Sequence, residues 1–184
     1  MKNITLDALL AFCAVVMGAV FMRILPHPPN IAPIAALALF CGITVPNWRG
    51  FALPIIVMVL SDIFLGFHAT IPFVYGSFML IVGIGYLLRK NKSPRNIILG
   101  SLIGSILFFF VSNFGVWMTS PMYEKTFSGL LHCYEMGIPF FRNTVIGDLL
   151  YTGIFFIGYR YLRLLFVLMM PSIQKIERHI GNTV

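Results

Sequence analysis

Charged residues are scarce in this chain of 184 residues. Only 10% of the residues are charged and 59% are hydrophobic, and the mean hydropathy is +0.91. Because a soluble domain carries roughly 25% charged residues, this composition excludes an ordinary soluble protein. Apolar runs long enough to cross the roughly 30 Å hydrocarbon core recur along most of the chain. We therefore expect an all-α integral membrane protein that forms a single transmembrane domain.

Sequence motifs for familiar chemistry are also missing. The chain has no Walker A sequence, no Gly-rich dinucleotide signature and no nucleophile motif. It has three cysteines, and no CxxC or HxxxH spacing of the kind that metal sites use. We therefore predict neither an enzyme nor a cofactor. The alternatives are a small membrane enzyme or a metal-binding membrane protein that uses outer-facing Asp and His residues. A metal site would draw on His27, His68, His132 and Cys133.

Six apolar runs predict one bundle of six transmembrane helices. They cover about residues 5–22, 33–45, 51–67, 71–88, 96–118 and 140–162. The second run is short for a span at about 1.5 Å per residue, so we expect it to be tilted, extended at its ends or shielded by its neighbours. We interpret residues 164–184 as a cytoplasmic interfacial tail.

The connection over residues 119–138 is the longest loop. It holds Phe127, Leu130, Leu131 and Tyr134 at helical spacing, which predicts a short amphipathic helix. This helix would be either a lid over the mouth of the bundle or an interfacial anchor.

Basic residues give the chain a formal net charge of +7 and fall mostly on one side of the predicted bundle. Ten basic residues lie on the side of both termini and three on the other, which makes the first side cytoplasmic. The charge therefore indicates membrane topology and lipid contact, and not a nucleic-acid partner. The ten are Lys2, Arg49, Arg89, Lys90, Lys92, Arg95, Arg160, Arg163, Lys175 and Arg178, and the three are Arg23, Lys125 and Arg142.

Residues 23–33 place four prolines beside a cation, an imidazole and a carboxamide. Each proline removes a backbone donor, so this stretch cannot be a continuous helix. We predict a stiff loop with His27 and Asn30 turned toward a ligand and Arg23 paired with Asp62. The alternative is a turn that merely ends one helix and starts the next.

Among the six acidic residues, only Asp62 and Asp148 lie inside predicted spans. A carboxylate in hydrocarbon is costly unless it is paired or hydrated, so both should face the bundle interior. The topology places most other polar groups at the same outer end, which predicts a substrate chamber. The alternative is a purely structural ion pair with Arg23 or Arg142. The predicted chamber residues are Arg23, His27, Asn30, Asp62, His68, Asn113, Trp117, Arg142, Asn143 and Asp148.

Small residues recur at four-residue spacing in two of the predicted helices. One set contains Gly100, Ser101, Gly104 and Ser105, and the other contains Ala11, Ala14 and Gly18. Such residues let helices approach closely in lipid, either within the bundle or against a partner subunit.

Four motifs together carry a family resemblance over almost the whole chain. They are RILPHPPNIAP at 23–33, SDIFLGFH at 61–68, NFGVW at 113–117, and PFFRNT at 139–144 followed by Gly147 and Asp148. With six helices in under 200 residues, the chain resembles the S component, or substrate-capture subunit, of an energy-coupling factor transporter. It is similar to an uncharacterised family of bacterial inner-membrane proteins built on that plan.

This resemblance implies a multi-pass protein that captures a vitamin or a precursor from the outer side. The partners it implies are an energy-coupling transmembrane protein and two ATPase subunits, and the alternative is a transporter that works alone. Aromatic residues around the predicted chamber favour a planar ring compound as the substrate.

Overall fold

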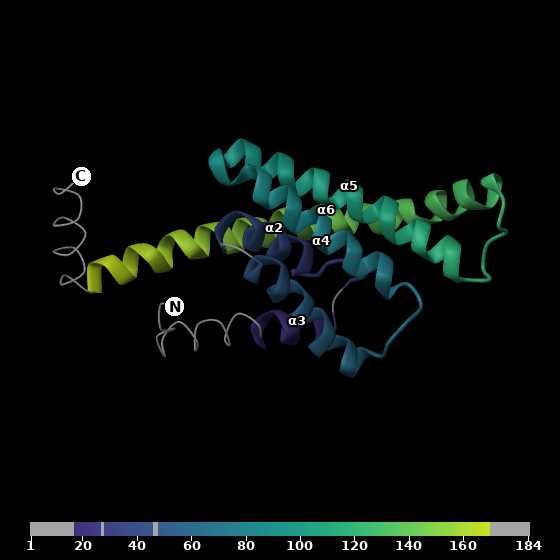
Figure 1. Cartoon of the computed structure of the whole chain (residues 1–184), viewed down its shortest axis with the longest axis horizontal. Coiled ribbons are helices and arrows are strands. Elements are labelled where there is room, and N and C mark those ends of the chain that lie inside the picture. The colour runs from purple at the N-terminus through teal and green to yellow at the C-terminus, as the bar shows by residue number, and fades with distance from the viewer. Residues whose placement is uncertain (1–16, 27, 46–47, 170–184) are drawn as a thin grey trace. The chain divides into compact units, whose positions relative to one another are not determined.

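The structure is a computed structural model that describes residues 17–26, 28–45 and 48–169. The chain divides into two compact units, residues 1–152 and 153–184, and the candidate site lies in the first. Most of the described residues are helical and none lies in a strand, which confirms the predicted all-α class. The elements are α2 (Ile34–Thr44), α3 (Arg49–Leu65), α4 (Ile71–Leu87), the 3-10 turn η1 (Leu88–Lys90), α5 (Pro94–Thr119) and α6 (Phe127–Met169) (Figure 1).

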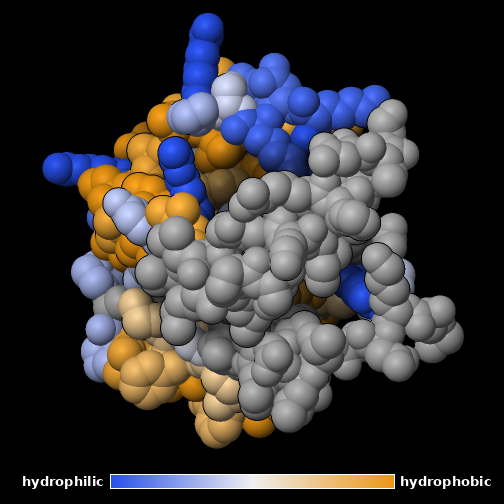
Figure 2. All heavy atoms as spheres, turned by 90° about the vertical axis from the view of Figure 1, so that its left-hand side faces the viewer, coloured by the Kyte–Doolittle hydropathy of each residue, from blue (hydrophilic) through white to orange (hydrophobic). Residues whose placement is uncertain are grey.

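Two of the described helical segments are long and apolar enough to cross a membrane. They are Ile71–Lys90 and Pro94–Thr119. Helix α2 is apolar but shorter, with 11 residues. Residues 17–24 are helical, whereas most of the first predicted span lies outside the described residues. Hydrophobic residues make up much of the coloured surface in Figure 2, and hydrophilic ones gather toward its upper edge.

Helix α2 lies at the centre of the first unit. It contacts α3, α4 and α5, and nearly all of its residues are buried. Its closest neighbour is α4, where Gly42 and Gly85 face each other. A Cβ added at Gly85 would lie 2.5 Å from the Leu39 carbonyl oxygen. The short second helix is therefore shielded by its neighbours, which is one of the predicted alternatives.

The last turn of α2 is held by Arg89 from η1. Its Nε donates to the Gly42 carbonyl oxygen at 2.5 Å, and its Nη2 donates to the Val45 carbonyl oxygen. The guanidinium also lies 4.7 Å from the centre of the Tyr86 ring. Since the last carbonyls of a helix have no partner within it, Arg89 supplies the missing donors.

Replacing Arg89 with alanine should lower the free energy of unfolding by about 1–1.5 kcal/mol, because the Gly42 and Val45 carbonyl oxygens lose their donor. The loss stays this small because water can hydrate these oxygens in part. Unfolding of the purified protein in a denaturing-detergent titration measures this. The matched control is the exposed neighbour Lys90, whose change to alanine should cost less than about 0.5 kcal/mol. Equal losses for the two variants would contradict the capping role.

The largest departure from the predicted boundaries is in α6. We expected a separate short helix near residue 127 and a span starting at 140, but one helix runs from Phe127 to Met169 with Pro139 inside it. Thr126 marks the start of this helix in the sequence. Its hydroxyl accepts a hydrogen bond from the backbone N–H of Gly129 and so caps the first turn. The predicted tail is likewise helical as far as Met169, and the rest lies outside the described residues.

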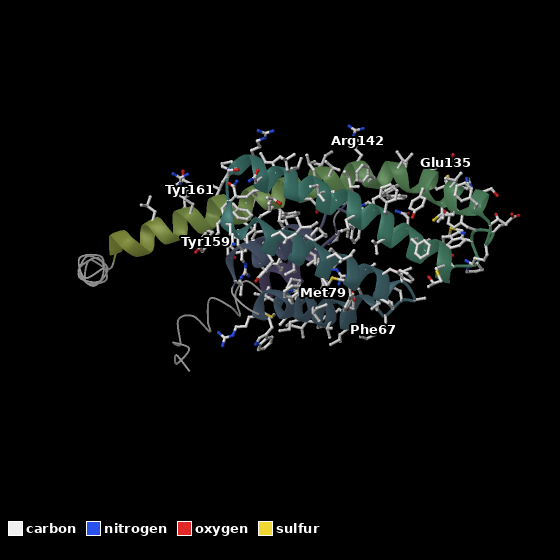
Figure 3. The ribbon with its side chains drawn as sticks, turned by 45° about the horizontal axis from the view of Figure 1, so that its top comes forward. Phe67, Met79, Glu135, Arg142, Tyr159 and Tyr161 are labelled. Atoms are coloured by element: carbon white, nitrogen blue, oxygen red, sulfur yellow. The ribbon has the colours of Figure 1, made fainter. Side chains whose placement is uncertain are left out.

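The first part of α6 packs along the end of α5. Tyr134 donates its hydroxyl to the Phe110 carbonyl oxygen at 3.1 Å, and the Cys133 thiol donates to the Asn113 carbonyl oxygen at 3.4 Å. Phe127 and Leu131, predicted on the apolar face, are exposed. The predicted apolar face is therefore right for Tyr134 but wrong for Phe127 and Leu131, because Cys133 and Gly137 pack on α5 in their place. Farther along α6, Arg142 is exposed and points away from the other helices (Figure 3).

The small residues of α5 face the interior of the unit. A Cβ at Gly100 would meet side chains of Leu88 and Leu39, and one at Gly104 would meet Ile81. Packing within the bundle is therefore confirmed for this set. Gly18, by contrast, is exposed with no atom near its added Cβ, and Ala11 and Ala14 lie outside the described residues.

Candidate functional site

The proline-rich segment connects the first described helix to α2. That helix ends after Ile24, and a turn follows in which the Ile31 N–H donates to the Pro28 carbonyl oxygen at 3.1 Å. Asn30 has a φ of 65°, a left-handed conformation that asparagine adopts more readily than most residues. The prediction that prolines break the helix here is confirmed. His27 lies outside the described residues.

Arg23 and Asp62 form the predicted ion pair. The Arg23 Nη1 lies 2.5 Å from the Asp62 Oδ1, and the same nitrogen donates to the Ser61 hydroxyl. Tyr75 donates its hydroxyl to the Asp62 Oδ2 at 2.6 Å. Asp62 is 0% exposed, and both of its oxygens are engaged. Asp62 therefore acts as the anchor that fixes and neutralises Arg23.

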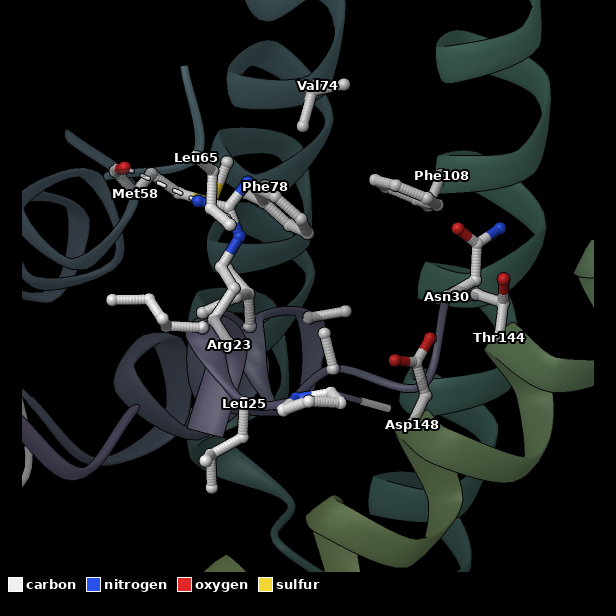
Figure 4. A pocket seen from close by; sticks show the side chains of 15 residues that line it. Arg23, Leu25, Asn30, Met58, Leu65, Val74, Phe78, Phe108, Thr144 and Asp148 are labelled. Atoms are coloured by element: carbon white, nitrogen blue, oxygen red, sulfur yellow. Dashed lines mark hydrogen bonds between the residues drawn. The ribbon is translucent and has the colours of Figure 1, made fainter. Parts of the chain in front are cut away.

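A cavity of about 420 Å³ lies beside this ion pair. This volume is within the usual range for small-molecule sites. Four polar side chains line the cavity: Arg23, Asn30, Thr144 and Asp148. The remaining wall is mainly apolar and includes Phe78 of α4 and Phe108 of α5 (Figure 4), whose rings stack with centres 5.3 Å apart. The cavity thus combines an apolar wall with a few polar groups from distant segments.

Asp148 differs from Asp62 in its partners. It is 3% exposed, and its Oδ2 accepts a hydrogen bond from the Ser105 hydroxyl at 2.7 Å. No Lys, Arg or His of the described part of the chain lies within ion-pair distance of it. Its carboxylate is turned toward the same space as the rings of Phe78 and Phe108 (Figure 4).

A second cavity of about 370 Å³ adjoins the first. Asn30, Val74 and Phe108 line both. The second cavity is also lined by Asn113 and by residues from the first part of α6, Cys133, Met136, Gly137 and Phe140. The Asn113 amide donates to the Phe109 carbonyl oxygen of its own helix at 2.8 Å.

The structure brings part of the predicted set to these cavities. Arg23, Asn30 and Asp148 line the first, and Asn30 and Asn113 line the second. Asp62 lines neither cavity but forms the ion pair with Arg23. Asn143 donates to the Pro29 carbonyl oxygen at 3.1 Å and so holds the turn that presents Asn30.

The other predicted residues line neither cavity. His68 is exposed and bonds to the Thr70 hydroxyl at 2.7 Å. Trp117 donates its indole N–H to the Glu124 carbonyl oxygen at 2.8 Å, which closes the connection between α5 and α6. Arg142 is exposed. Sequence position alone could not place these residues around the helix axis.

Several polar partners of the site were not predicted from the sequence. Thr144 lies four residues before Asp148, so helical spacing puts both on one face of α6. This spacing was enough to predict Thr144 as a site residue. Ser105 was interpreted only as a small packing residue, yet its hydroxyl bonds to Asp148. Tyr75 lies within an apolar run close to Ser77, and no spacing signal marks it as the partner of Asp62.

Metal-ligating side chains are dispersed in the described part of the chain. No three His, Cys, Asp or Glu residues gather there in a way that could hold an ion. Cys133 is buried against α5, and burial raises the pKa of its thiol, so it remains protonated near neutral pH.

These features define an all-helical protein with a partly polar cavity between its helices. The chain belongs to the DUF6580 family, a family of unknown function, which it matches over residues 3–171. No curated protein and no solved structure matches it.

Proposed function

We propose that this protein is a membrane transport protein that binds a small molecule, as a substrate-capture S component does. The observation that carries the proposal is the cavity of about 420 Å³, in which Arg23, Asn30, Thr144 and Asp148 converge on an otherwise apolar space. Pockets of this composition bind small molecules because the apolar wall supplies affinity and the few polar groups fix orientation. The ion pair with Asp62 prevents Arg23 from turning away.

The proposed setting is the bacterial inner membrane, crossed six times with both termini in the cytoplasm. Support comes from α5, on which one face of exposed apolar side chains runs the length of the helix. It consists of Leu99, Ile103, Ile106, Phe110 and Phe114. Such a face suits contact with lipid. Basic residues in the connection between α4 and α5 favour the cytoplasmic side for that end.

The proposed partners follow from the resemblance to the S component of an energy-coupling factor transporter. They are an energy-coupling transmembrane protein and two ATPase subunits, and the alternative is a transporter that works alone. Gly18 supports a docking face, because it is exposed on the first described helix and no described atom lies within 4 Å of its added Cβ. The alternative to transport is a small membrane enzyme or a metal-binding membrane protein that uses Asp and His residues.

The proposed topology can be tested with single cysteines in a variant that lacks the three natural ones. A cysteine in place of Lys125 should react with an impermeant maleimide on intact cells. A cysteine in place of Lys92 should react only after the membrane is opened, because it would lie on the cytoplasmic side. Labelling of K92C from outside would contradict the six-span arrangement.

Binding can be tested by native mass spectrometry of the purified protein. We expect a co-purifying small molecule that is retained in the E135Q control variant and lost when Phe78 is replaced with tryptophan, which fills the cavity. A bound species that persists in F78W would contradict binding in this cavity. Uptake of that molecule by cells that express the protein then tests transport.

A further inference from the structure

We infer that the cavity binds a molecule that carries a protonated amine, with Asp148 as its counter-charge. This inference rests on the proposed function only in assuming that the cavity takes a ligand. Its starting point is the charge of the wall. Arg23 is already neutralised by Asp62, whereas Asp148 faces the cavity with no cationic partner among the described residues. An ionised carboxylate in this position would be stabilised by a cation from the ligand.

The hydrogen bond between Ser105 and Asp148 is compatible with an ionised carboxylate. The Ser105 hydroxyl has one proton and two acceptors within reach, the Asp148 Oδ2 at 2.7 Å and the Ser101 carbonyl oxygen at 3.1 Å. The shorter contact is the one to the carboxylate, and donation to a carboxylate stabilises its charged form. The Asp148 Oδ1 accepts no hydrogen bond from the described residues, so it is available to a ligand.

Two further oxygen atoms accompany this carboxylate. Thr144 uses its hydroxyl proton on the Phe140 carbonyl oxygen at 3.1 Å, so toward the cavity its oxygen can only accept. Asn30 adds a side-chain carbonyl. Asn30, Thr144 and Asp148 lie on one side of the cavity (Figure 4). A primary ammonium has three donors and no acceptor, which matches three oxygen atoms of which one is charged.

The remaining wall indicates the body of the ligand. Phe78 and Phe108 stack with an angle of 20° between their planes and form a continuous aromatic surface. Such a surface suits a planar ring, and its ring faces also attract positive charge. The ligand class is therefore an amine attached to a flat, largely apolar ring.

Three indole compounds with the same ring and side arms of similar length test the charge directly. They are tryptamine, which is cationic, tryptophol, which is neutral, and indole-3-acetate, which is anionic. Isothermal titration of the purified wild-type protein should show tryptamine binding at least tenfold more tightly than the other two. Equal affinities, tighter binding of the anion, or no saturable binding of tryptamine would overturn the inference. This ranking needs no variant and so does not depend on the folding of one.

The variant D148N then tests the residue. Asparagine has the size of aspartate and can still accept from Ser105, but it has no charge. Tryptamine affinity should fall at least tenfold while tryptophol affinity stays unchanged. The control E135Q removes an exposed carboxylate from the same helix and should leave both affinities unchanged. Unchanged tryptamine affinity in D148N would indicate a protonated, neutral Asp148 and would overturn the inference.

Uptake into proteoliposomes separates this inference from the proposed function. Saturable, Asp148-dependent binding of tryptamine without uptake of any bound compound would overturn transport and leave the amine site standing. Uptake of a neutral or anionic compound that is indifferent to D148N and to competition by tryptamine would overturn the amine site and leave transport standing.

Discussion

Replacing Asp62 with leucine is expected to lower the free energy of unfolding by about 3–5 kcal/mol. The reason is that the change leaves the Arg23 guanidinium, whose side chain is only 14% exposed, without its carboxylate. Tyr75 loses its acceptor as well. Denaturing-detergent titration of the purified protein measures the loss, and we expect much of the variant to be degraded in cells.

A double variant shows whether the stranded charge causes this loss. Replacing Arg23 with methionine in the D62L background removes both charges and keeps similar volumes. Because apolar replacements of a buried ion pair are often close to neutral, the double variant should regain most of the lost stability. If D62L alone is as stable as the wild type, the ion pair is not the anchor described above.

Replacing Gly85 with alanine should cost a net amount of about 2 kcal/mol. The new Cβ would lie 2.5 Å from the Leu39 carbonyl oxygen and 2.9 Å from the Gly42 Cα, both of which are backbone atoms that side-chain rotation cannot move. Overpacking of this kind costs typically about 1–3 kcal/mol, and here α2 and α4 must separate. The better helix propensity of alanine offsets up to about 1 kcal/mol of that cost.

Gly83 provides the control in the same helix. It lies two residues earlier in α4, and no atom lies within 4 Å of its added Cβ. The same substitution there should raise the free energy of unfolding by about 0.5–1 kcal/mol, because only the propensity term remains. If both variants change stability in the same direction, close contact between α2 and α4 is not what Gly85 provides.

The sequence predicted helix positions well where proline or charge bounds an apolar run. Helix α5 begins at Pro94, beside Ser93, whose hydroxyl accepts from the Asn96 N–H at 3.3 Å. Helix α2 begins directly after Pro33. The ion pair of Arg23 with Asp62 was predictable because an arginine and an aspartate within or beside apolar segments have few other partners.

The sequence failed where packing outweighs a local signal. Pro139 removes one backbone hydrogen bond from α6, yet the helix continues through it because the turns before it are packed on α5. Arg142 was grouped with Asp148 because both lie in the outer half of one span. Six residues apart, they fall on different faces of the helix, and Thr144 is the residue that shares a face with Asp148.

Asn30, Val74 and Phe108 line both cavities, so these three residues form the boundary between them. A boundary of this kind depends on side-chain rotamers. Because Phe108 also stacks on Phe78, a substitution at this one position would alter the walls of both cavities at once.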